Sequence, residues 1–117
     1  MTHDDLEKYI RSLGHTVEQI VDPNGQGYTV VRDLTIPTGS LAGTVCDVAI
    51  ARVSDVPYVL PTAIHTRPHL VAMNTAAPLA TQPSAIGADW QYWSRRYERP
   101  PTTKGIWAHV LTVLGEV

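Results

Sequence analysis

Cysteine is scarce in this sequence, which contains a single one, Cys46. One cysteine cannot form a disulfide within the chain, and it cannot build a zinc site that needs several thiolates. Disulfide-stapled domains are typical of oxidising compartments, so this composition indicates a reducing one. We therefore expect a cytoplasmic protein.

Long apolar runs and excess positive charge are missing as well. No stretch approaches the roughly 20 residues that cross a bilayer as a helix, and the charged start, MTHDDLEKYIRSLGH, lacks the apolar core of a signal peptide. The net charge of −2 disfavours contact with nucleic-acid phosphates. The sequence thus predicts neither a membrane nor a nucleic-acid partner. One small basic group near its end is interpreted as solvated surface: Arg95, Arg96, Arg99 and Lys104.

Length and composition predict one ordinary globular domain over residues 1–117. The chain is 44% hydrophobic and 17% charged, values that separate it from disordered sequences. A chain of this length has room for one core and no second. Because no phosphate-binding glycine loop is present, no cofactor is expected.

Local patterns predict a helix at each end of the chain. Apolar residues recur at helical spacing from Leu6 to Leu13, with capping oxygens in residues 2–5 and a stop at Gly14. Near the other end, residues 103–114 place Ile106, Val110 and Leu114 on one face, with Trp107 beside them. We expect this second helix to pack on a sheet with Trp107 facing it.

The middle of the chain predicts strands. Residues 16–21 and 28–36 are rich in Val, Ile, Thr and Tyr and flank a turn, which is typical of a β-hairpin. A third strand is expected over 44–53 and a fourth over 62–65. Proline, alanine and threonine dominate residues 67–88, which are interpreted as an irregular crossing. The order predicts an α+β fold: an N-terminal helix, a four-stranded antiparallel meander, a long loop and a C-terminal helix.

Two stretches carry a resemblance to a known family. Residues 55–61, DVPYVLP, look like a degraded proline-rich turn, and residues 89–96, DWQYWSRR, precede Arg99-Pro100 and the final helix. The second stretch is similar to the W-x-x-W-S-R-H segment of prokaryotic family E of the ubiquitin-conjugating (UBC) superfamily. The sequence departs from that pattern at Arg96, where the family has histidine, and at residues 55–57, where a tyrosine-proline pair is more common.

The resemblance spans roughly residues 15–114 and implies a UBC-like fold. Family members occur in bacterial gene clusters with ubiquitin-like proteins, activating enzymes and JAB-type peptidases. The resemblance therefore implies a role in ubiquitin-like modification, with a ubiquitin-like modifier or an activating enzyme as the protein partner.

Thioester chemistry requires a nucleophilic cysteine that is partly exposed and readily ionised. In the superfamily this cysteine follows the fourth strand, but residues 65–90 contain none. Cys46 falls in the third predicted strand, among valines and isoleucines, and is interpreted as a small buried hydrophobic residue. We expect no catalytic residue of the usual kind.

Histidines and serines leave other possibilities open. His65 and His69 occupy the place of the superfamily's histidine-proline-asparagine turn, but Pro68 disfavours a helix that would let them share a metal, and no third ligand is recognisable. No metal site is expected. A serine–histidine hydrolase is conceivable, although no G-x-S-x-G turn supports it; it would combine Ser84 or Ser94 with His65, His69 or His109.

Tryptophan and arginine give two interpretations of the final motif. Trp90 and Trp93 lie three residues apart and could both pack on the helix that carries Trp107. Alternatively they form a partner-binding ridge with Arg95 and Arg96, since tryptophan and arginine are enriched in interface hot spots. The predicted partner-binding residues are Trp90, Trp93, Arg95, Arg96, His65 and His69.

The leading hypothesis is a non-catalytic UBC-like module that binds a protein of a bacterial ubiquitin-like pathway. One rival is a divergent conjugating enzyme that uses Cys46 or a nucleophile other than cysteine. A second rival is an accessory or scaffold subunit of a bacterial defence or mobile-element system.

Overall fold

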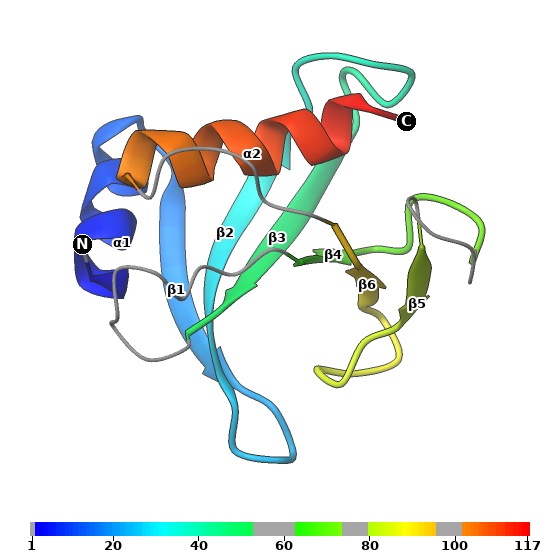
Figure 1. The fold of residues 1–117 in the computed structure, drawn as a ribbon, viewed down its shortest axis with the longest axis horizontal. Coiled ribbons are helices and arrows are strands. Elements are labelled where there is room, and N and C mark those ends of the chain that lie inside the picture. The colour runs from blue at the N-terminus through cyan, green and yellow to red at the C-terminus, as the bar shows by residue number, and fades with distance from the viewer. Residues whose placement is uncertain (1, 53–62, 74–79, 96–101) are drawn as a thin grey trace.

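The computed structural model describes residues 2–52, 63–73, 80–95 and 102–117. Two helices accompany an antiparallel sheet, so the predicted α+β class is confirmed (Figure 1). The predicted turn at 55–61 lies outside the described residues, as do Arg96 and Arg99-Pro100. In chain order the elements are α1 (His3–Ser12), β1 (Thr16–Val21), β2 (Gly27–Thr35), β3 (Val45–Ala51), β4 (Ile64–Arg67), β5 (Thr81–Pro83), β6 (Gln91–Trp93) and α2 (Thr103–Gly115).

Within the described residues the sheet has six strands, where four were predicted, in the order β1-β2-β3-β4-β6-β5. The first four strands neighbour each other in chain order, and β6 and β5 extend the sheet beyond β4. The prediction of an irregular crossing over 67–88 is therefore wrong at Thr81–Pro83, which pairs with β6. A three-residue strand is too short to show an alternation of apolar and polar residues, and a proline such as Pro83 disfavours the prediction of a strand.

The β1–β2 hairpin forms where it was predicted, because Asp22 organises its turn. The Asp22 carboxylate accepts the backbone N–H groups of Asn24 at 2.8 Å and Gln26 at 3.0 Å. Such side-chain bonds to the backbone are the reason why aspartate favours turns. They fix the register in which Val21 pairs with Gly27.

Both predicted helices are confirmed, and each begins at a threonine cap. The Thr2 hydroxyl accepts the N–H of Asp5 at 3.0 Å, and the Asp5 carboxylate accepts the N–H of Thr2, which completes a capping box. At α2 the Thr102 hydroxyl accepts the N–H of Gly105 at 2.9 Å. These caps satisfy amide groups that no carbonyl inside the helix can reach.

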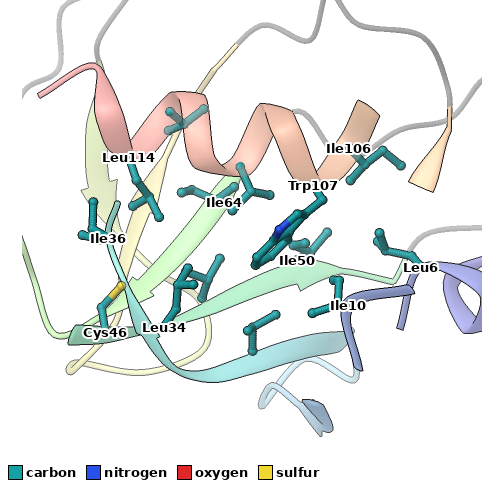
Figure 2. Close-up of a cluster of buried hydrophobic side chains, with 14 of the residues drawn as sticks. Leu6, Ile10, Leu34, Ile36, Cys46, Ile50, Ile64, Ile106, Trp107 and Leu114 are labelled. Atoms are coloured by element: carbon teal, nitrogen blue, oxygen red, sulfur yellow. The ribbon is translucent and has the colours of Figure 1, made fainter. Parts of the chain in front are cut away.

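The main core lies between the two helices and one face of the sheet (Figure 2). Trp107 points from α2 toward the sheet and is 5% exposed, as predicted. Apolar side chains of α1, such as Leu6 and Ile10, join the same cluster. The sheet contributes Val17, Val31, Leu34, Cys46, Val48, Ile50, Ile64 and Trp93 to it.

A buried carboxylate ties α1 to the sheet. Glu7 is 2% exposed and accepts hydrogen bonds from Thr29 Oγ1 at 2.6 Å and Gln19 Nε2 at 3.1 Å. Arg52, directly after β3, forms an ion pair with the same carboxylate. A buried charge is tolerated only with partners of this kind, so Glu7 fixes the position of α1 on β1, β2 and the end of β3.

The opposite face of the sheet carries a second, smaller apolar cluster. Tyr28 and Val30 of β2, Ala49 of β3 and Trp90 are all buried in it. Ile86 packs against this cluster, so the segment 84–90 covers part of the second face. The central strands are therefore apolar on both sides, which explains why β3 lacks a clean alternation.

We expect Trp107→Ala to lower the free energy of unfolding by about 3–5 kcal/mol, because it empties a large aromatic site in the main core. Val21→Ala is the control, since Val21 is 69% exposed and such a change costs about 0.5 kcal/mol or less. Urea unfolding measures both. A loss below about 1 kcal/mol for Trp107→Ala would show that this position is not a core position.

Candidate functional site

The W-x-x-W motif spans β6, where neighbouring side chains point to opposite faces of the sheet. Trp93 is completely buried in the main core, and its Nε1–H donates to Thr66 Oγ1 at 2.9 Å. Trp90 is 4% exposed in the second cluster, with the Arg67 guanidinium 4.6 Å from its ring centroid. Of the two tryptophans that could pack on the helix of Trp107, Trp93 joins the cluster of that helix and Trp90 belongs to the other cluster. Residues three apart share a face in a helix but not in a strand.

Gln91 is the residue of the motif that the sequence reasoning missed. Its amide side chain is completely buried; Oε1 accepts the N–H groups of Leu70 at 3.0 Å and Val71 at 3.4 Å, and Nε2 donates to Val71 O at 2.7 Å. Gln91 therefore fixes the segment that follows β4. The signal available in the sequence was a polar residue next to a tryptophan. If such a residue is buried, its side chain needs a hydrogen-bond partner.

Arg95 is a structural residue rather than an exposed hot spot. Its Nη1 donates to Ala80 O and to Ser94 O, both at 2.7 Å, and its guanidinium lies 5.3 Å from the centroid of the Trp93 ring. The Ser94 N–H also donates to Ala80 O, at 3.1 Å. In the described part of the motif, Trp90, Trp93 and Arg95 thus make contacts within the protein, and Arg95 and Ser94 hold the end of β6 against residue 80.

His65 is buried on the second face of the sheet. Its ring lies 5.1 Å from the rings of both Tyr28 and Tyr92, and Nδ1 lies 2.7 Å from Ser84 Oγ. Burial lowers the pKa of His65 to about 4, although the Asp22 carboxylate acts in the opposite direction. The Tyr28 hydroxyl donates to Asp22 Oδ2 at 2.9 Å. The ring is therefore neutral near pH 7 and held in a fixed orientation.

His69 follows β4 and is exposed. His65 and His69 contact the two ends of the segment 84–88. His69 Nε2 lies 3.0 Å from Ala88 O, while His65 contacts Ser84. Of the serine–histidine combinations that the sequence left open, the structure brings Ser84 and His65 together. In the described part of the chain, no group of three or more His, Cys, Asp or Glu side chains is placed to hold a metal ion.

Cys46 is 3% exposed and belongs to the main core, as predicted. Burial raises the pKa of its thiol to about 11, and the negative charge of Asp47 makes a smaller contribution in the same direction. A thiol with this pKa is almost entirely protonated near neutral pH, and the thiolate is the nucleophile. Its burial in the main core, near Leu34 and Ile36, also keeps a second protein away from the sulfur (Figure 2).

The segments that the motif holds in place present an exposed surface of their own. We call it the loop surface, and it is formed by the exposed side chains of residues 68–73 and 80–89. It includes one of the most exposed large apolar side chains of the chain, Met73, at 45%. The other exposed members are Pro68, His69, Ala72, Gln82, Pro83, Ala85, Ala88 and Asp89.

These features define a small α+β protein whose two helices cover one face of an antiparallel sheet and whose sole cysteine is buried in the core on that face. The chain belongs to prokaryotic E2 family E, whose family model matches residues 2–116. The comparisons with curated proteins and with solved structures found no match. Neither helix in the described residues has the length and apolar character that a membrane crossing requires.

We expect Cys46 of the native protein to react with Ellman's reagent at least ~10²-fold more slowly than Cys46 of the urea-unfolded chain. The reason is that both its burial and its raised pKa suppress thiolate attack. Absorbance at neutral pH follows the reaction, with the unfolded chain as the reference. Equal rates in the two states would favour catalysis by Cys46 instead.

We also expect the free energy of unfolding to fall as the pH drops from 6.5 toward 4. In this window the unfolded chain protonates His65 while the folded chain, in which the pKa of His65 is about 4, does not. The unfolded state then binds more protons, so acid favours it, by up to about 3 kcal/mol. Urea unfolding at several pH values measures the slope, and His65→Gln should remove most of it. An unchanged slope in this variant would assign the effect to other groups.

Proposed function

We propose that this chain is a UBC-like protein-binding module of a bacterial ubiquitin-like modification pathway that works without a cysteine thioester. The observation that carries the proposal is the combination of E2 family membership over residues 2–116 with a sole cysteine buried at 3% exposure. An E2-like protein with no accessible thiol retains the surfaces of the family without its usual nucleophile. The partner we propose is a ubiquitin-like modifier or an activating enzyme, met in the cytoplasm.

The loop surface is the place where we propose that the partner binds. It rests on Trp90, Trp93 and Arg95, whose side chains make contacts within the protein. The side chains left available to a partner lie on the segments that these residues position, and Met73 is the large apolar one among them. Exposed apolar side chains with polar neighbours are typical of interface centres.

The divergent-enzyme hypothesis draws support from one specific contact, which joins Ser84 to His65. It requires a nucleophile other than cysteine, and Ser84 is a candidate for that role. This contact is compatible with partner binding at the loop surface, because Ser84 lies within the same stretch of chain.

We expect Met73→Asp combined with His69→Ala to weaken binding of the partner by about 1–3 kcal/mol, the effect of losing interface hot spots. Both side chains are exposed, but His69 contacts Ala88 O and the Met73 sulfur accepts from Gln91 Nε2, so the melting temperature of the double variant is measured beside its affinity. Candidate partners are any ubiquitin-like or activating proteins that are encoded near this gene, and titration calorimetry measures the affinity.

Val21→Asp is the matched control, since it places the same charge on an apolar side chain that is 69% exposed in the β1–β2 hairpin. Its affinity should equal that of the unmodified protein. Arg95→Ala is unsuitable for this test, because it removes hydrogen bonds to Ala80 and Ser94 and should lower the melting temperature. Equal affinities for the double variant and the control would place the interface elsewhere.

A further inference from the structure

The Ser84–His65 pair has the geometry of a nucleophile beside a base. Ser84 Oγ lies 2.7 Å from His65 Nδ1, within the reach needed for proton transfer. The same oxygen accepts the N–H of Ile86 at 3.1 Å, and an amide donor stabilises negative charge that develops there. Ser84 is half-buried, and the histidine that it contacts is buried.

The surroundings of His65 suit a neutral ring that gains a proton for a short time. Tyr28 and Tyr92 approach it with their rings and fix its orientation. Burial keeps the ring unprotonated at neutral pH, so the lone pair of Nδ1 is free to accept the hydroxyl proton in the Nε2–H tautomer. Asp22, held by the Tyr28 hydroxyl, favours the imidazolium that would form.

The contact between a half-buried hydroxyl and a buried, neutral ring favours one class of substrate. Burial lowers the pKa of the ring and makes it a weaker base, which disfavours attack on a stable amide. The ring can assist attack on a carbonyl that is already activated by a good leaving group. Thioesters and aryl esters have that property.

We propose that Ser84 is an acyl acceptor, with His65 as its general base, toward activated thioesters or esters. Ser84 Oγ forms a bond to the acyl carbon while its proton passes to His65 Nδ1. The carbon–sulfur or carbon–oxygen bond to the leaving group then breaks, and the leaving group takes the proton from His65. The products are an ester on Ser84 and a free thiol or alcohol, with no change of oxidation state. In the cell the donor would be the thioester-activated carboxyl terminus of a ubiquitin-like modifier. The identity of this donor rests on the proposed function.

The test uses p-nitrophenyl acetate as the probe, so it does not depend on any natural partner. The full chain is incubated with the ester at neutral pH, and peptide mass spectrometry locates the acetyl group. We expect Ser84 to be acetylated at least about tenfold faster than Ser12, an exposed serine of α1 whose hydroxyl donates to Tyr9 O. Urea-unfolded chain should lose this preference.

Three variants separate catalysis from a merely structural contact. Ser84→Ala should lose the adduct, Ser94→Ala should keep it, and His65→Gln should slow acetylation of Ser84 by about 10²-fold, the usual contribution of a general base. Near-ultraviolet circular dichroism checks that each variant is folded. If His65→Gln does not fold, the comparison of Ser84 with Ser12 in the unmodified protein decides.

Equal acetylation of Ser84 and Ser12 in the native protein, or an unchanged rate in a folded His65→Gln variant, would overturn the proposal. The contact would then serve only to hold residues 84–90 on the sheet. Because neither result bears on the affinity of the loop surface for a partner, failure here is distinguishable from failure of the proposed function.

Discussion

The alternation of side chains along β6 is the constraint on which β4, β5 and the segments between them depend. Trp93 enters the main core and anchors on Thr66, while the adjacent Tyr92 points the other way, toward the ring of His65. Gln91 shares the inner side and holds the backbone of residues 70–71. Three neighbouring residues thereby fix the core, the second face and the segment after β4. A shift of the register by one residue would reverse all three.

The two helices and the β1–β2 hairpin could be predicted because their determinants are local. A capping threonine, an aspartate in a turn and an apolar stripe act over three or four residues, and each is visible in the sequence. The strands β5 and β6 depend on pairing between residues about ten apart, such as Thr81 with Trp93. Three residues carry too little periodicity to reveal such a pairing, and for this reason the sheet was predicted with four strands.

The candidate site was predictable only in part, for the same reason. The burial of Cys46 follows from its apolar neighbours in one strand, and this prediction is confirmed. The positions of Trp90 and Trp93 required knowledge of the secondary structure between them. The approach of Ser84 to His65 joins residues 19 positions apart, and nothing in either local sequence favours this pair over the other serine–histidine combinations.

The contact between Glu7 and Arg52 has a consequence for how this family can diverge. The two residues are 45 positions apart. Arg52 is the closest counter-charge of the buried Glu7, and it pairs with the exposed Asp4 as well. Loss of Arg52 leaves the buried Glu7 carboxylate without its closest counter-charge, at a cost of about 3–5 kcal/mol, a large part of the total stability of a small protein. Drift at these positions must therefore pass through a neutral intermediate or a paired replacement. Positions 7 and 52 should therefore covary among related sequences, because their ion pair attaches α1 to the sheet.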